Sequence, residues 1–166
     1  GNPVRARRAS ERGQVAVYAV LLFPVLMLTL ALVLAVGTIE GLRTRIRAQL
    51  DMAALTATQA LDPAGLAAGE PPRLQVAEAE RLAREYLALN LAATGDVLAA
   101  TPSEIAAAAE IVVSNEPGID PITGAENTVP TVSIQISAPA RIPLLGLAGI
   151  DPVVTLTIDG SASART

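Results

Sequence analysis

Acidic and amide side chains gather in one turn-rich stretch, EPGIDPITGAENTVP, which covers residues 116–130. Carboxylate and amide oxygens are the ligands that Ca²⁺ prefers, so Asp120, Glu126 and Asn127 are candidate calcium ligands. Their spacing fits no EF-hand loop, and Asp, Asn, Gly and Pro are also the usual residues of tight turns. We therefore favour a plain hairpin over a calcium site. The predicted turn residues are Asp120, Pro121, Thr123 and Gly124.

The composition argues against an enzyme. The 166 residues contain no His and no Cys, which removes the usual general base at neutral pH, the commonest metal ligand and the best nucleophile. The sequence also has no paired carboxylates, no glycine-rich phosphate loop and no nucleophile placed beside a base. We expect no catalytic residue and no cofactor. The net charge of −4 argues against nucleic acid as a partner.

The turn-rich stretch lies between segments that are typical of strands. TVSIQIS (131–137) alternates apolar and polar residues, and PVVTLTIDGSASA (152–164) does so again. EIVVS (110–114) also has the composition of a strand. A helix is predicted before them in RLQVAEAERLAREYLALNLAA (73–93). The expected fold is therefore α+β, with one helix on an antiparallel sheet of three or four strands over residues 73–166.

Two further details of this domain can be predicted. Glu80 and Arg84 are four residues apart in the helix and should form an ion pair. The apolar insert IPLLGLAGI (142–150) is interpreted as a loop that covers the core of the sheet, with an exposed docking patch as the alternative. The expected apolar stripe of the helix consists of Ala79, Leu82, Tyr86 and Leu89.

The N-terminal part of the chain contains a long apolar segment. The 25 residues from Val15 to Ile39 include no charge, and as a helix they would be about 37 Å long, slightly more than the hydrocarbon core of a bilayer. A membrane span over 15–39 is the favoured interpretation, with the packed core of a larger assembly as the alternative. Pro24 lies inside the segment and should kink the helix.

The helix should continue beyond the apolar segment, over residues 14–61 in all. Asp62-Pro63 should end it, and residues 62–72 are expected to form a loop. The continuation is either a stalk or a packing helix. Its apolar stripe consists of Leu42, Ile46, Leu50, Ala53, Ala57 and Ala60. The residues that should pack this helix against others are Tyr18, Pro24, Ala53, Ala54, Ala57 and Ala60.

Basic residues flank the apolar segment on both sides. Residues 1–13 form a basic arm with Arg5, Arg7, Arg8 and Arg12, and Arg43, Arg45 and Arg47 follow the segment. This distribution favours an N-terminus in the cytoplasm and a C-terminal domain outside the cytoplasmic membrane.

Several of these features together resemble TadE/TadG-like proteins of the Flp (tight adherence) pilus systems. The matching stretches are ERGQVAVYAVLLFPVLMLTL across the apolar segment and RIRAQLDMAALTATQAL after it, with Gln49 and Asp51. The Asp-Pro-x-Thr-Gly hairpin at Asp120 and the C-terminal order of strand, apolar insert and strand are also similar. Gly13 fits a prepilin peptidase site, but the fifth residue after it is Tyr18 rather than Glu. The chain therefore looks more like the unprocessed branch, or like a divergent pilin that keeps its arm.

The resemblance implies a structural, pilin-like component of an adhesion pilus. Its partners would be other copies of itself or other pilins in a homo-oligomeric filament, which it meets through the N-terminal helix after leaving the membrane. It would be either the filament subunit or a minor subunit. The alternative function is a binding module outside the cytoplasm, tethered by a single membrane helix.

Overall fold

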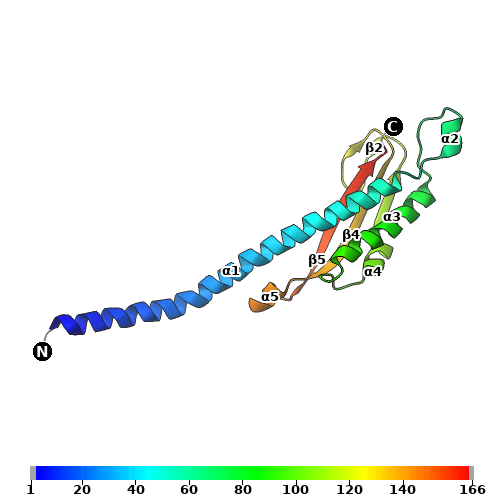
Figure 1. Cartoon of the computed structure of the whole chain (residues 1–166). Coiled ribbons are helices and arrows are strands. Elements are labelled where there is room, and N and C mark those ends of the chain that lie inside the picture. Colours follow the sequence, from blue (N-terminus) through cyan, green and yellow to red (C-terminus); the bar gives the residue numbers. More distant parts are fainter. Residues whose placement is uncertain (1–2, 165–166) are drawn as a thin grey trace. The chain divides into compact units, whose positions relative to one another are not determined.

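The computed structural model describes the backbone of residues 3–164 and the side chains from Ala16 to Ala164 (Figure 1). Contacts between Cα atoms divide the chain into two compact units. The first unit consists of Gly1–Thr38 with Ile142–Pro152, and the second consists of Ile39–Arg141 with Val153–Thr166. The fold is α+β, as predicted: a long apolar helix followed by a small domain that contains helices and an antiparallel sheet.

Helix α1 runs from Pro3 to Ala57. It begins at Pro3 rather than at residue 14, so most of the predicted basic arm is helical. Proline is well suited to the first helical position, and the Arg, Ala and Glu residues that follow are good helix formers. The predicted orientation residues Arg5, Arg7, Arg8 and Arg12 carry side chains that lie outside the described residues.

The same helix ends at Ala57, before the predicted end at residue 61. The chain leaves the helix in tighter turns, in which Gln59 N–H donates to the carbonyl of Thr56 and Ala60 N–H to that of Ala57, both at 3.1 Å. The predicted loop at 62–72 is also not entirely loop. It contains α2 (Pro63–Ala67), whose first turn is capped because the Asp62 carboxylate accepts the N–H of Ala64.

Two helices of the domain follow. The predicted helix forms as α3 (Val76–Leu91), which continues into the short 3₁₀ helix η1 (Ala92–Thr94). Its buried side chains are Ala79, Ala83, Leu87 and Leu91. The predicted stripe is therefore wrong for Tyr86 and Leu89, which are exposed. Helix α4 (Pro102–Ala107) is short and begins with a complete capping box between Thr101 and Glu104.

The predicted ion pair of α3 is also wrong. The guanidinium Nη1 of Arg84 instead donates to the carbonyl oxygens of Ala106, Ala107 and Ala109, at 3.0–3.1 Å. These carbonyls lie at the C-terminal end of α4, where backbone acceptors lack partners inside the helix. Arg84 therefore ties α4 to α3.

The main sheet has three antiparallel strands in the order β1-β4-β5. They are β1 (Glu110–Ser114), β4 (Thr131–Arg141) and β5 (Val153–Ser163). In register, Ile134 of β4 is opposite Ile111 of β1 and Gly160 of β5. A separate two-stranded ribbon pairs β2 (Gly118–Ile119) with β3 (Glu126–Asn127).

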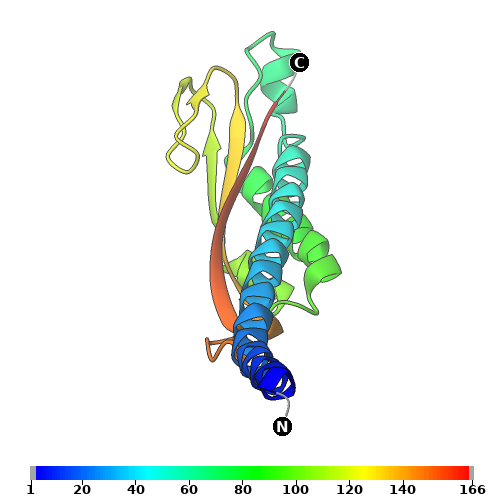
Figure 2. The ribbon, with the colours of Figure 1, turned by 90° about the vertical axis from the view of Figure 1, so that its left-hand side faces the viewer.

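The core of the second unit lies between the sheet and two helices. The part of α1 after Thr38 runs along β5, with α3 beside it (Figures 1 and 2). The predicted stripe of α1 is confirmed, since Leu42, Ile46 and Leu50 are buried together with the alanines that follow them. The sheet contributes Val132, Ile134, Ile136, Ala138, Ala140, Leu156 and Ile158.

In the first unit, the apolar insert forms α5 (Pro143–Leu147) within Ile142–Pro152. The insert belongs to the unit of the apolar helix rather than to that of the sheet, and both interpretations of it stay predictions. Ile142 and Leu145 are buried, whereas Leu147 is 73% exposed and Ile150 48% exposed. The insert therefore covers apolar surface with one set of side chains and presents another set outward.

Candidate functional site

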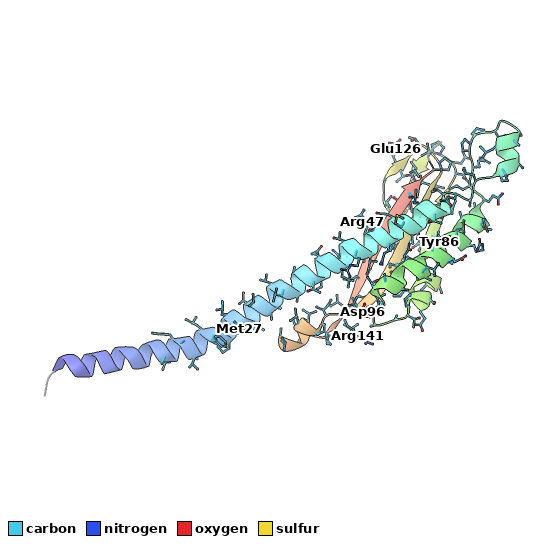
Figure 3. All side chains as sticks on the ribbon, in the orientation of Figure 1. Met27, Arg47, Tyr86, Asp96, Glu126 and Arg141 are labelled. Atoms are coloured by element: carbon cyan, nitrogen blue, oxygen red, sulfur yellow. The ribbon has the colours of Figure 1, made fainter. Side chains whose placement is uncertain are left out.

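The apolar part of α1, from Ala16 to Thr38, presents almost all of its side chains to the surroundings. Leu21, Leu22, Phe23, Val25 and Leu26 are all 60–63% exposed. Figure 3 shows side chains projecting from α1 around Met27. Ala31 and Ala35 are the exceptions, with exposures of 9% and 0%.

Among the described residues, one helix is long and apolar enough to cross a membrane, Ala16–Ala57. In its most apolar window only 6% of the residues are buried inside the chain. The core helix of a soluble domain would be mostly buried, so this segment is a candidate membrane anchor.

The two threonine hydroxyls of the apolar segment are satisfied within the helix. The hydroxyl of Thr29 donates to the carbonyl of Val25, and that of Thr38 donates to the carbonyl of Leu34, both at 2.8 Å. Pro24 lies inside the helix, where it removes one backbone hydrogen bond. Tyr18 is 55% exposed. The segment thus has the properties that a lipid environment or a packed helix bundle requires.

The alanines predicted to pack against other helices lie inside the second unit. Ala53, Ala54 and Ala57 are completely buried, and Ala60 is 7% exposed. Their small side chains allow α1 to approach its own domain closely. Of the predicted packing residues, Tyr18 and Pro24 are therefore the ones on the exposed apolar segment.

Residues of the stretch after the apolar segment hold α1 to the domain. The carbonyl of Gln49 accepts from Asn90 Nδ2 at 3.2 Å, and its side-chain Oε1 accepts from the hydroxyl of Thr94 at 3.3 Å. One carboxylate oxygen of Asp51 accepts the backbone N–H of Ser161 at 3.0 Å. The two residues that support the family resemblance here have contacts within the chain itself.

The predicted hairpin places Asp120 at its centre, where this residue is 1% exposed. Its Oδ1 accepts the backbone N–H groups of Ile122 and Thr123, both at 2.8 Å. Its Oδ2 accepts from Asn127 Nδ2 at 3.3 Å and from the hydroxyl of Ser133. Both oxygens are thus occupied by donors from the protein.

Electrostatically, this environment favours the ionised carboxylate. Burial raises the pKa of Asp120, but the hydrogen bonds from Ser133, Thr123, Ile122 and Asn127 outweigh burial and hold its pKa below the ordinary value of 3.8. The backbone completes the turn, since Gly124 N–H donates to the carbonyl of Asp120 and Gly124 has the positive φ of 70° that suits glycine.

The three candidate calcium ligands do not form one set. Asp120 and Asn127 lie together, but Asn127 directs its amide nitrogen, a donor, at the carboxylate. Glu126 is exposed on the ribbon of β2 and β3 (Figure 3). Among the described residues, no group of three His, Cys, Asp or Glu side chains is placed to hold a metal ion. The arrangement of Asp120 is that of a structural turn.

Two side chains that matter here have roles that no sequence pattern predicts. Ser133 was expected on the polar face of its strand, but it is completely buried beneath Asp120. The side-chain amide of Asn115 pairs with both the N–H and the carbonyl of Leu74, at 2.7 and 3.0 Å, and no sequence pattern indicates this contact. Both contacts join residues that are distant in the chain.

Comparison of the chain with protein-family models, with curated proteins and with solved structures gives no match.

Proposed function

We propose that the chain is a membrane-anchored, pilin-like structural subunit of a Flp-type adhesion pilus. One observation carries the proposal: a single helix is apolar and uncovered from Ala16 to Thr38, and from Ile39 to Ala57 it forms part of the core of an α+β domain. Such a helix provides an anchor in one segment and part of the domain core in the next.

The uncovered segment explains why a partner is needed. Burying one large apolar side chain contributes about 1.5–3 kcal/mol, and this segment exposes many such side chains in succession. A bilayer covers them before assembly. In a filament, the same segments of neighbouring subunits would replace the lipid, with Tyr18 and Pro24 in the contact.

The alternative is a binding module that the helix merely tethers. This function would need a ligand site on the domain. The acidic hairpin does not favour it, because the Asp120 carboxylate is saturated by protein donors. The uncovered helix suits both functions. The family resemblance and the saturated carboxylate of the hairpin therefore support the structural function over the binding function.

The test uses the absence of cysteine from the chain. A single cysteine replaces Val33 in the apolar segment, where the side chain is 63% exposed, or Leu89 on α3 as the control, where it is 61% exposed. Both variants are expressed in full length in the producing cells, surface appendages are sheared off, and thiols are oxidised before electrophoresis without reductant.

We expect the protein in the sheared fraction, with disulfide-linked dimers for Val33→Cys and far fewer for Leu89→Cys. Protein that stays with the membrane, and monomers for both variants, would overturn the pilus proposal and leave a tethered module. Dimers of Val33→Cys confined to the membrane fraction would indicate an assembly component at the pilus base rather than a filament subunit.

A further inference from the structure

The insert Ile142–Pro152 forms one compact unit with the apolar part of α1. Figures 1 and 2 both show α5 beside the middle of that helix. Ala31 and Ala35, the two buried residues of the helix in this unit, mark where the helix is covered. The insert supplies Ile142 and Leu145 as its own buried side chains.

The positions of Ala31 and Ala35 along the helix can be measured from the end of the apolar segment. Glu40 is the first charged residue after the apolar segment. At 1.5 Å per residue, Ala35 lies about 7 Å and Ala31 about 13 Å before Glu40 along the helix axis. If Ala16–Thr38 spans a bilayer, an element that covers these alanines lies at the boundary between headgroups and acyl chains.

The insert has the composition that this boundary requires. From Ile142 to Ile150 it contains no charged residue, and Arg141 and Asp151 flank it. Leu147 is 73% exposed and Ile150 is 48% exposed. An uncharged element that exposes apolar side chains can bury them at the boundary of the acyl chains.

The backbone of the insert is satisfied internally. Ile142 N–H donates to the carbonyl of Pro152 at 2.6 Å and closes the base of the loop. Ile150 N–H donates to the carbonyl of Leu145 at 3.1 Å, and the N–H groups of Leu145, Ala148 and Gly149 also donate within the insert. An element with its polar groups paired in this way loses little when it leaves water.

We propose that Ile142–Pro152 is a second membrane-contacting element, with Leu147 and Ile150 inserted into the lipid surface at the C-terminal end of the span. This inference rests on the membrane anchoring in the proposed function. A second copy of the chain is the less suitable occupant, because two side chains offer far less surface than the roughly 1,200–2,000 Å² of a stable protein interface. Two apolar side chains are sufficient for an element whose chain is already anchored.

The experiment places one fluorescent label at each of three positions in the full chain. Leu147→Cys reports on the insert, Leu26→Cys on the interior of the span, and Leu89→Cys on the surface of the domain; all three side chains are more than 60% exposed. Each variant is labelled with nitrobenzoxadiazole and reconstituted into vesicles of phosphatidylethanolamine and phosphatidylglycerol. The vesicles carry a nitroxide either near the headgroup or near the end of the acyl chain.

We expect a blue-shifted label at 147 that loses more fluorescence to the shallow nitroxide than to the deep one. The label at 26 should show the reverse order, and the label at 89 should respond to neither. Ile150→Cys, a second variant of the insert, should behave as Leu147→Cys does.

The inference is overturned if the label at 147 behaves like the label at 89 while the label at 26 is quenched, because the span then stands without a second element. If the label at 26 is not quenched either, the membrane anchoring itself is wrong, and the inference fails with it. A blue shift at 147 that disappears when the chain is diluted with lipid would assign the insert to a contact between copies instead.

Discussion

The segments Ala16–Thr38 and Ile39–Ala57 of α1 belong to one helix but differ in what covers them. The first is apolar on all sides and largely exposed, and the second buries a single stripe against its own domain. In the second segment, Arg43, Arg45 and Arg47 occupy the face that stays outside. Periodicity, rather than apolar content, therefore distinguishes the part of a long helix that folds within its chain from the part that needs a partner.

The largest expected difference in stability is between two variants. Each of them replaces one leucine by alanine, one in the second segment and one in the first. Leu50 is completely buried, whereas Leu34 is 51% exposed. We expect Leu50→Ala to lower the free energy of unfolding of the domain by about 2–5 kcal/mol, because it removes apolar contacts and leaves a cavity. Leu34→Ala should change it by less than about 0.5 kcal/mol. Urea unfolding of the full chain in nanodiscs, followed by circular dichroism, measures both, and equal losses would refute the division of the helix.

A smaller effect is expected from acid, which should act on the domain and leave the uncharged segment unaffected. The pKa of folded Asp120 lies below its ordinary value of 3.8. Its ionised form therefore stabilises the fold above that value, and this contribution is lost as the pH falls through the lowered pKa.

The variant that tests this contribution is Asp120→Asn. Its side chain has one acceptor oxygen, whereas both carboxylate oxygens of Asp120 accept hydrogen bonds. We expect it to cost about 1.5–3 kcal/mol at neutral pH, the range for a hydrogen bond to a charged group. The difference from the natural chain should shrink as the pH falls below the ordinary value. A difference that stays constant with pH would contradict the ionised state of Asp120 in the hairpin.

The smallest expected loss of stability comes from a substitution in β5. It tests how closely the second segment of α1 packs on the sheet. A Cβ atom at Gly160 would lie 2.7 Å from both Leu50 Cβ and Asp51 Oδ1. Gly160→Ala should therefore force α1 away from β5 and cost about 1–3 kcal/mol. Gly118→Ala is the control, since no atom lies within 4 Å of its added Cβ. An unchanged melting temperature for both variants would mean that the helix contact is looser than described.

Much of the fold follows from periodic patterns in the sequence. The stripe from Leu42 to Ala60 was predicted correctly because large and small apolar residues recur there at helical spacing, with arginines between them. The strand predicted at 110–114 matches β1, and the one at 131–137 lies within β4.

Other features depend on contacts between distant parts of the chain. The predicted stripe of α3 is wrong for Tyr86 and Leu89, because half of the buried residues are alanines, which contrast little with the apolar residues on the exposed face. The alternation in TVSIQIS predicts Ser133 on a polar face, but β4 is the central strand, and Asp120 lies over that face. Whether a carboxylate binds a metal or caps a turn depends on which donors surround it, and the donor from Ser133 comes from thirteen residues away.

The contact between Asp51 and Ser161 affects whether strands of other molecules can pair with the edge of the sheet. β5 is an edge strand, and an uncovered edge offers its N–H and carbonyl groups to the strands of other molecules. At Ser161 the outward N–H is already taken by Asp51, so the edge cannot pair with another strand through this group. Chains gathered by their apolar helices would bring such edges near one another at high local concentration. A helix that occupies this donor of β5 would hinder the pairing of these edges.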